Sequence, residues 1–269
     1  MILVYRALGL GDFLTGVPAL RALVDRFGAV TLAAPAALAP LVECLPGVAL
    51  EPCEELAPVP RRARRADVTF NLHGRGPQST ALLRRSRPRR LVAFDHGDGA
   101  TWRPGEHEVV RWCRLLASAG IPADPARLGL RPPARPVARA IRRATIVHPG
   151  AATAARRWPA ERFARVARHE EAAGRKVFVT GGPGEVPLAR AVAAGAGLPS
   201  DRVLAGRTDL GEAAALVAVA GRIVCGDTGI AHLATALGTP SAVIFGPTSP
   251  AEWGPPGGPR HRVLWAGRP

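Results

Sequence analysis

The segment of residues 223–236, IVCGDTGIAHLATA, contains the residues with the clearest chemical potential. A short apolar run ends in the turn Asp227, Thr228 and Gly229, which leads into a helical pattern. The first N–H groups of a helix lack backbone partners and carry the positive end of its dipole, so this turn predicts an anion site. Thr228 and His232 are four residues apart and would lie on one side of that helix. The alternative is that Asp227 or Thr228 only caps the helix and His232 is a satisfied interior histidine.

A second stretch, residues 148–163 with the sequence HPGAATAARRWPAERF, shows a similar arrangement. Gly150 and small residues follow a predicted strand, and Thr153, Arg156 and Arg157 precede the next helix. A glycine turn lets a phosphate approach the backbone closely, and an arginine can bind it through paired hydrogen bonds. The alternative for the two arginines is a solvated helix flank.

Two carboxylates also follow predicted strands. Glu185 ends the turn of residues 181–185, where it could hold ribose hydroxyls or simply complement a helix dipole. Asp12 lies in the first glycine-rich turn, where it could take a proton from a hydroxyl. The alternative for Asp12 is an N-cap of a helix starting at Phe13. We expect the neighbouring helix N-terminus to keep the pKa of Asp12 low.

The elements that must position these residues follow an α/β pattern. Apolar runs ending in Gly, Pro or His alternate with Ala-rich segments of helical length, as in parallel strands joined by crossover helices. The predicted strands are residues 2–8, 30–33, 68–72, 91–94, 145–148, 177–180, 223–225 and 242–245. The predicted helices include residues 13–27, 106–119, 160–173, 185–194, 210–219 and 230–237.

A proline-rich segment divides the chain into two halves. Residues 121–136, IPADPARLGLRPPARP, contain five prolines, which cannot continue a helix or an interior strand. We therefore predict domains at residues 1–136 and 137–269, both Rossmann-like and facing each other across a cleft. Ligands in such sheets lie beyond the carboxyl ends of the strands, where the turns described above are located.

The composition indicates a globular protein with a basic surface. The chain has 269 residues, 47% of them hydrophobic, and a formal charge of +15 that predicts attraction to anions. A P-loop is excluded because the single lysine, Lys176, follows Arg175, and Leu14 replaces the third glycine of a dinucleotide fingerprint. Zinc spacing among the four cysteines and a D-x-D clamp are both missing. We therefore expect no metal site and a metal-independent reaction.

Two arginine runs, RRARR at residues 61–65 and RRSRPRR at residues 84–90, have no assigned role. They lack the interleaved aromatics that stack on bases, so binding to nucleic acid is a minor hypothesis. Such runs usually mark a solvated face or attraction to anionic lipid. The most apolar stretch, residues 29–50, is interrupted by prolines, and the N-terminus lacks signal-peptide features. We expect a cytoplasmic protein whose only membrane contact is peripheral, at the inner face.

Several motifs together resemble a known family. HPGAATAARRWPAERF, VFVTGGPGE, CGDTGIAHLATALGTPSAVIFGPTSPAEWGP and LGLGDFLTGVPALRAL resemble the glycosyltransferase family 9 heptosyltransferases, which add ADP-activated heptose to lipopolysaccharide core. ADVTFNLHGRGPQSTALL is a weaker match, with Asn71 where the family often has an acid. The resemblance implies a GT-B fold and an inverting, metal-independent sugar transfer from a nucleotide diphosphate donor, ADP-heptose being favoured, to an acceptor hydroxyl.

The resemblance also implies roles for single residues. The nucleotide would lie mainly in the second domain and the glycan, lipid-linked or other hydroxyl acceptor in the first. Asp12 corresponds to the proposed general base. The nucleotide-sugar contacts implied by the family, together with the glycine of the preceding turn, are Gly150, Thr153, Arg156, Glu185, Asp227, Thr228, Gly229 and His232. The donor is a substrate, so no further cofactor is expected.

One departure from the family leaves an alternative open. GT-B enzymes have a C-terminal helix that crosses back to the first domain. The sequence ends soon after RHRVLWAG, so we expect no such helix here. A nucleotide-sugar-binding protein without transferase activity is therefore the second hypothesis.

Overall fold

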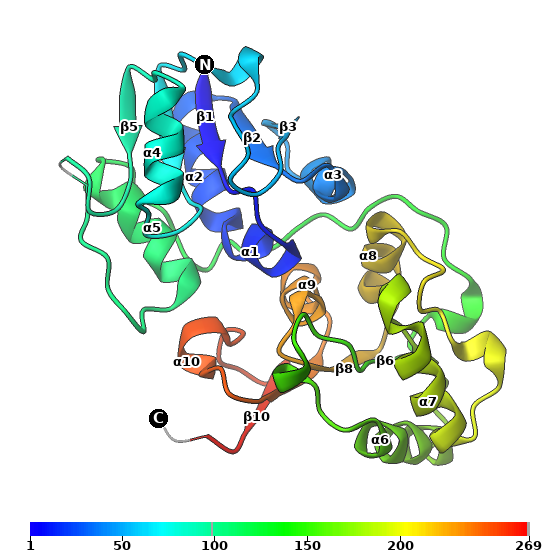
Figure 1. Cartoon of the computed structure of the whole chain (residues 1–269). Helices are drawn as coiled ribbons and strands as arrows, with labels where there is room; N and C mark the ends of the chain where they lie inside the picture. Colours follow the sequence, from blue (N-terminus) through cyan, green and yellow to red (C-terminus); the bar gives the residue numbers. More distant parts are fainter. Residues whose placement is uncertain (98, 268–269) are drawn as a thin grey trace. The chain divides into compact units, whose positions relative to one another are not determined.

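The chain forms two compact units, Met1–Leu128 and Gly129–Pro269, in a computed structural model that describes residues 1–97 and 99–267 (Figure 1). The boundary expected at residues 136 and 137 lies inside the second unit. Residues 121–136 form neither helix nor strand, as their prolines require.

The first unit is built on a five-stranded parallel sheet in the order β3-β2-β1-β4-β5. Its strands are β1 (Ile2–Tyr5), β2 (Val30–Ala34), β3 (Val48–Pro52), β4 (Val68–Asn71) and β5 (Arg90–Val92). Its α-helices are α1 (Leu10–Thr15), α2 (Val17–Phe27), α3 (Ala39–Val42), α4 (Gln78–Arg85) and α5 (Glu108–Ser118). The strand order reverses between β1 and β4, and that switch point is where ligands of doubly wound sheets bind.

The second unit has a five-stranded parallel sheet in the order β10-β9-β8-β6-β7. Its strands are β6 (Thr145–His148), β7 (Val177–Val179), β8 (Arg222–Gly226), β9 (Ser241–Phe245) and β10 (His261–Trp265). Its α-helices are α6 (Ala160–Ala172), α7 (Val186–Ala196), α8 (Leu210–Val219), α9 (Gly229–Leu237) and α10 (Pro250–Trp253). Here the order reverses between β6 and β8. The predicted α/β class, with two Rossmann-like sheets, is confirmed.

The composition explains how the layers pack. The central strands are buried on both faces, with Leu3, Val4 and Tyr5 all fully buried, so they read as continuous apolar runs. On the second sheet, α6 and α7 pack closely through small residues: a Cβ on Gly195 would lie 3.0 Å from the Cβ of Ala164. Small residues such as Gly195 and Ala164 thus let α6 and α7 approach each other closely.

Some elements differ from the sequence prediction. The helix expected at residues 13–27 is two helices, α1 and α2, with Gly16 between them. A Cβ at Gly16 would lie 3.1 Å from the Arg6 side chain, so the break makes room for a buried arginine. Helix α4 and strand β3 were not predicted, because QSTALLRR has few apolar residues and VALEP ends in a charge and a proline.

Glu170 on α6 holds the amino ends of β6 and β8 together. Its carboxylate accepts a hydrogen bond from the Thr145 hydroxyl at 2.6 Å and two from Arg175 at 2.7 Å, with Arg222 at 3.6 Å. These contacts, the Arg175 hydrogen bonds first, lower the pKa of Glu170 from 4.5 to about 2.

We predict that Glu170→Gln destabilises the protein at neutral pH by on the order of 2 to 3 kcal/mol. The native pKa lies below the unfolded value, so this stability is present above pH 4.5 and is lost as the pH falls towards about 2. Urea unfolding of both proteins at several pH values measures it. An equal difference at pH 7 and at the acid end would contradict the assignment.

Candidate functional site

The loop after β6 crosses the carboxyl ends of β8 and β9. It contains a short 3₁₀ helix, Ala154–Arg156, whose N-cap is Thr153. A Cβ at Gly226, the last residue of β8, would lie 3.1 Å from the Arg156 carbonyl oxygen, and one at Gly246 would lie 3.2 Å from the Ala155 carbonyl oxygen. The two glycines therefore let this loop lie directly over the ends of the strands, at the switch point of the second sheet.

The loop brings Arg156 to Asp227. The Arg156 Nε lies 3.6 Å from the Asp227 Oδ2, and Asp227 is only 4% exposed. That carboxylate oxygen is buried and accepts no hydrogen bond within the described residues. An ion pair is therefore the main compensation for its charge in the described structure.

The N-terminus of α9 lies beside this pair. Thr228 is the N-cap residue, but its side chain makes no capping hydrogen bond, so the alternative that Thr228 only caps the helix through its side chain is wrong. Gly229 opens the helix, and His232 follows one turn later, half-buried with its ring 6.0 Å from that of Trp253. A helix N-terminus without a side-chain cap, next to a guanidinium, is suited to bind an anion.

Glu185 and Gly150 form the other half of this edge. The Glu185 carboxylate accepts a hydrogen bond from the Gly182 N–H at 2.7 Å and lies 3.8 Å from the His148 Nε2. A Cβ at Gly150 would overlap that carboxylate, so only glycine leaves it in place.

His148 is a contact that the sequence analysis missed. It ends β6, is buried, and its Nδ1 forms a 3.0 Å hydrogen bond with the Thr180 hydroxyl. Burial lowers the pKa of His148, and the Glu185 carboxylate opposes that shift. The sequence did offer one signal for this contact, since His148 is a polar residue at the end of a buried apolar strand.

The structure therefore brings the eight predicted nucleotide-sugar residues to one edge of the second sheet. Gly150 and Glu185 are in contact at the ends of β6 and β7, and Arg156, Asp227, Thr228 and Gly229 gather at the end of β8. Thr153 is exposed on the crossing loop, and His232 lies in the first turns of α9.

In the first unit, Asp12 lies inside the first turn of α1. The N-cap of that helix is Gly9, so the alternative that Asp12 caps a helix beginning at Phe13 is wrong. The Asp12 Oδ1 lies 3.6 Å from the Arg6 Nη2, and the Asp12 side chain is 31% exposed. Arg6 thus holds Asp12 on its buried side, while part of the Asp12 side chain remains open to solvent.

Arg6 is a buried cation at the β1/β4 switch point, and the sequence analysis overlooked it. It directly follows β1, is 1% exposed, and donates to the carbonyl oxygens of Asp12 and Leu72 and to the Thr15 hydroxyl, the last at 3.0 Å. Leu72 follows β4, so this one side chain ties together the ends of both strands.

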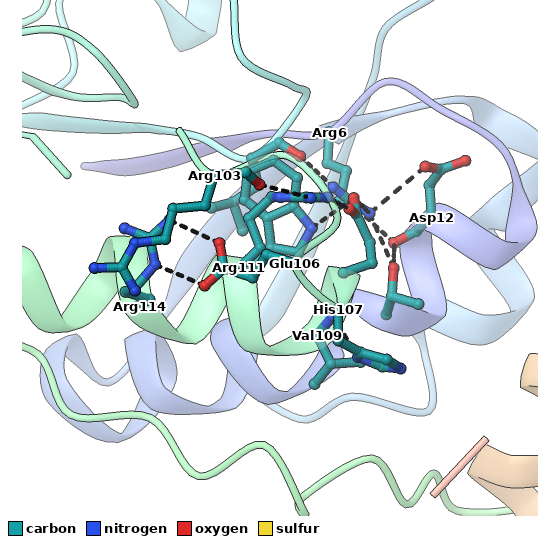
Figure 2. A network of polar contacts seen from close by, with 12 residues as sticks. Arg6, Asp12, Arg103, Glu106, His107, Val109, Arg111 and Arg114 are labelled. Atoms are coloured by element: carbon teal, nitrogen blue, oxygen red, sulfur yellow. Dashed lines mark hydrogen bonds and ion pairs between the residues drawn. The ribbon is translucent and has the colours of Figure 1, made fainter. Parts of the chain in front are cut away.

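Figure 2 shows the polar contacts around Arg6 and Asp12. Glu108 on α5 supplies the compensating charge. Its Oε1 lies 3.2 Å from the Arg6 Nη2 and accepts a 2.9 Å hydrogen bond from the Trp112 indole. Arg111 bonds to the other oxygen, and the Arg6 guanidinium lies 4.7 Å from the centre of the Trp112 ring. A buried cation with a full set of partners holds a single position.

Burial and this network together shift the pKa of Asp12. Burial is the largest influence and raises the pKa of Asp12, Arg6 lowers it, and the Glu108 carboxylate raises it further. The net shift is upward, so the expectation of a low pKa set by the helix N-terminus is wrong. A carboxylate with a raised pKa is a stronger base.

Asn71, where the resembled family often has an acid, has a local role. It is fully buried at the end of β4, and its amide donates to the hydroxyls of Ser79 and Thr80 at 3.0 and 3.1 Å. Its oxygen accepts the His73 N–H at 3.2 Å. Asn71 therefore holds the loop after β4 against α4.

The described residues, with position 98 and the last two positions set aside, contain no group of three His, Cys, Asp or Glu side chains placed to hold a metal ion. Over the same residues, no helix is both long and apolar enough to cross a membrane.

Comparison with known families and sequences gives consistent matches. A family model described as glycosyltransferase family 9 (heptosyltransferase) matches residues 77–269, which include the whole second unit and leave Asp12 outside the match. Residues of this chain are 32% identical over 113 positions to lipopolysaccharide heptosyltransferase 2 of Escherichia coli and 33% identical over 107 positions to lipooligosaccharide heptosyltransferase 2 of Haemophilus influenzae. These matches cover 41% and 38% of this chain but only 32% and 30% of the relatives.

Solved structures resemble nearly the whole chain. A family 9 glycosyl transferase from Veillonella parvula matches with a TM-score of 0.81 at 21% identity, over 98% of this chain and 85% of its own. An E. coli ADP-heptose lipopolysaccharide heptosyltransferase II matches with a TM-score of 0.77 at 23% identity, over 98% and 89%. E. coli heptosyltransferase WaaC with ADP matches with 0.75 at 19%, over 99% and 93%. The fold is thus GT-B-like, with two Rossmann-like domains.

We predict that Glu108→Gln lowers the pKa of Asp12, because it removes the second-largest influence that raises it while keeping the side-chain shape. Carbon-detected NMR titration of the carboxyl groups, with Asp12→Asn for assignment, measures the shift. Glu106→Gln is the control, since Glu106 bonds to Arg114 instead. An Asp12 titration unchanged by Glu108→Gln, in a protein that still unfolds cooperatively, would refute the electrostatic coupling.

Proposed function

Because the chain belongs to glycosyltransferase family 9 (heptosyltransferase), we propose that it transfers a sugar from a nucleotide diphosphate donor to an acceptor hydroxyl. The observation that carries this proposal is the arrangement at the β6/β8 switch point. Arg156 lies there against buried Asp227, beside the N-terminus of α9 that no side chain caps.

The second unit provides what a sugar diphosphate needs. When the bond to the sugar breaks, the diphosphate gains negative charge, and groups aimed at it stabilise the transition state more than the ground state. The N–H groups of Gly229 and its neighbours and the Arg156 guanidinium are such groups. In this proposal Asp227 holds the guanidinium in position, and transfer proceeds without a metal ion.

Glu185 is the proposed contact for the ribose. Its carboxylate accepts a hydrogen bond from the Gly182 N–H and lies near His148, which leaves acceptor capacity for hydroxyl donors. Because Gly150 has no side chain, the carboxylate can lie directly against the backbone at the end of β6. Thr153, Thr228 and His232 are proposed to contact the donor from the crossing loop and from α9.

Asp12 is the proposed general base. An acceptor hydroxyl must lose its proton as it attacks the anomeric carbon, and the raised pKa of Asp12 makes its carboxylate a competent proton acceptor. Attack opposite the leaving diphosphate inverts the anomeric configuration. Arg6 holds this carboxylate, and burial, Arg6 and Glu108 together set its basicity.

The relatives suggest which substrates to test. One similar structure is named for its ADP complex and another for ADP-heptose. We therefore propose ADP-heptose as the donor and a lipopolysaccharide-type glycan as the acceptor, at the cytoplasmic face of the membrane. The same site without turnover, in a nucleotide-sugar-binding protein, is the competing outcome.

We predict that Arg156→Gln weakens ADP binding by about 10- to 100-fold, the range for loss of a charge-assisted hydrogen bond. Isothermal titration calorimetry measures it. Arg165→Gln is the control, since Arg165 is an exposed arginine on α6. Equal affinities for the wild type and Arg156→Gln would remove Arg156 from the diphosphate site.

We predict that Asp12→Asn lowers the rate of sugar transfer by about 10²- to 10⁴-fold, the usual contribution of a general base, while ADP binding is retained. Asp25→Asn is the control, because Asp25 pairs with Arg127 on the surface of the same unit. Undiminished transfer by Asp12→Asn would rule out the base. Donor binding with no transfer by the wild type to any acceptor would favour the competing outcome.

A further inference from the structure

The two arginine runs, separate in the sequence, form one surface at the amino end of the first sheet. We call it the arginine surface, formed by the arginines of residues 61–65 and 84–90. The Arg65 N–H donates to the Ser86 carbonyl at 2.8 Å, and the Arg89 N–H donates to the Ala66 carbonyl at 2.9 Å. The first run precedes β4 and the second leads into β5, so neighbouring parallel strands bring both runs to the same edge.

The charge of this surface is largely uncompensated. All nine arginines of the two runs are exposed. Arg62 pairs with Glu51 and Arg89 lies 3.6 Å from Asp67, while the other seven form no ion pair within the described residues. Arg65 and Arg87 have φ angles of +55° and +54°, a conformation that favours glycine, and yet both positions carry a cation.

The arginine surface is separate from the proposed chemistry but connected to it. The arginine surface lies at the amino ends of the strands and Asp12 lies beyond their carboxyl ends. A four-residue strand such as β4, which is about 13 Å long, separates the two edges. A cavity of about 640 Å³ runs along the face of α4 formed by Pro77, Thr80, Ala81 and Arg84, up to Phe94 and Asp95 after β5. Its far end lies at Arg84, in the arginine surface, and its near end at the carboxyl edge.

We propose that the arginine surface docks the protein on the phosphate layer of an anionic membrane. Guanidinium groups bind phosphate oxygens through paired hydrogen bonds. Seven arginines without ion pairs in one patch could each contact a different phosphate of a membrane surface, where negative headgroups lie side by side. The inference rests on the proposed function, since a lipid-linked acceptor would be presented at such a surface. Nucleic acid fits less well, because neither run contains an aromatic residue to stack on bases.

The test is flotation of the full chain with vesicles of phosphatidylcholine alone and of phosphatidylcholine mixed equally with phosphatidylglycerol. The triple variant Arg61→Gln, Arg85→Gln and Arg87→Gln removes three cations from the arginine surface. At the usual contribution of each basic residue near an anionic surface, we expect about a hundredfold lower partition into the mixed vesicles. Binding by the wild type should also fall as salt is added.

The matched control removes the same charge elsewhere. Arg131→Gln, Arg135→Gln and Arg139→Gln alter three exposed arginines of the second unit, and this triple should bind the mixed vesicles as the wild type does. Thermal unfolding of both triples confirms that they are folded. Equal loss in the two triples, or equal wild-type binding to neutral and mixed vesicles, would overturn the proposal. Tighter binding of duplex DNA than of mixed vesicles at the same salt would overturn it too.

A second measurement separates this inference from the proposed function. Transfer to a lipid-free acceptor fragment should be unchanged in the arginine-surface triple. Lost vesicle binding with retained transfer supports both proposals. Wild-type vesicle binding that depends on these arginines, without transfer to any acceptor, leaves docking standing and refutes the transferase.

Discussion

An ionised side chain inside a protein must be paired, because leaving it unpaired costs several kcal/mol. Each unit of this chain places one such charge at the switch point of its sheet, Arg6 in the first and Asp227 in the second. Each therefore requires a partner from a distant segment: Glu108 on α5 for Arg6, and Arg156 on the crossing loop for Asp227. The pairing fixes the segments that form the two candidate sites, so the proposed chemistry depends on these buried charges.

The consequence differs between the units. In the second, pairing holds a cation next to the N-terminus of α9, and an arriving diphosphate would find a site already assembled. Preorganisation of this kind lowers the cost of binding and of charge development. In the first unit the paired cation lies behind Asp12, while burial and the Glu108 carboxylate raise the pKa of Asp12. The same requirement thus places a cation beside a helix N-terminus in one sheet and a carboxylate with a raised pKa in the other.

Much of this could be predicted from the sequence. The apolar runs and glycine turns located most strands and all eight nucleotide-sugar candidates, because chemistry in parallel sheets follows the strand ends. Arg6, Glu108 and His148 were missed for a common reason: each acts through a partner far away in the chain, which periodicity does not reveal. The raised pKa of Asp12 could not be predicted either, since burial, which the sequence does not show, outweighs the lowering of that pKa by Arg6.

The arginine surface could not be predicted from the sequence either. Each run alone is typical of a solvated flank, and only the pairing of β4 with β5 joins them into one surface. That surface occupies the end of the first unit that the proposed chemistry leaves unused.

The central claim is that the β6/β8 switch point binds a sugar nucleotide, and thermal unfolding with ADP-, GDP-, UDP- and TDP-sugars tests it most directly. A ligand that binds the native state at about a hundred times its Kd stabilises it by about 2.7 kcal/mol. We expect a clear rise in Tm with at least one of these donors, ADP-heptose first, and little or none in Arg156→Gln. No rise with any of them would contradict it.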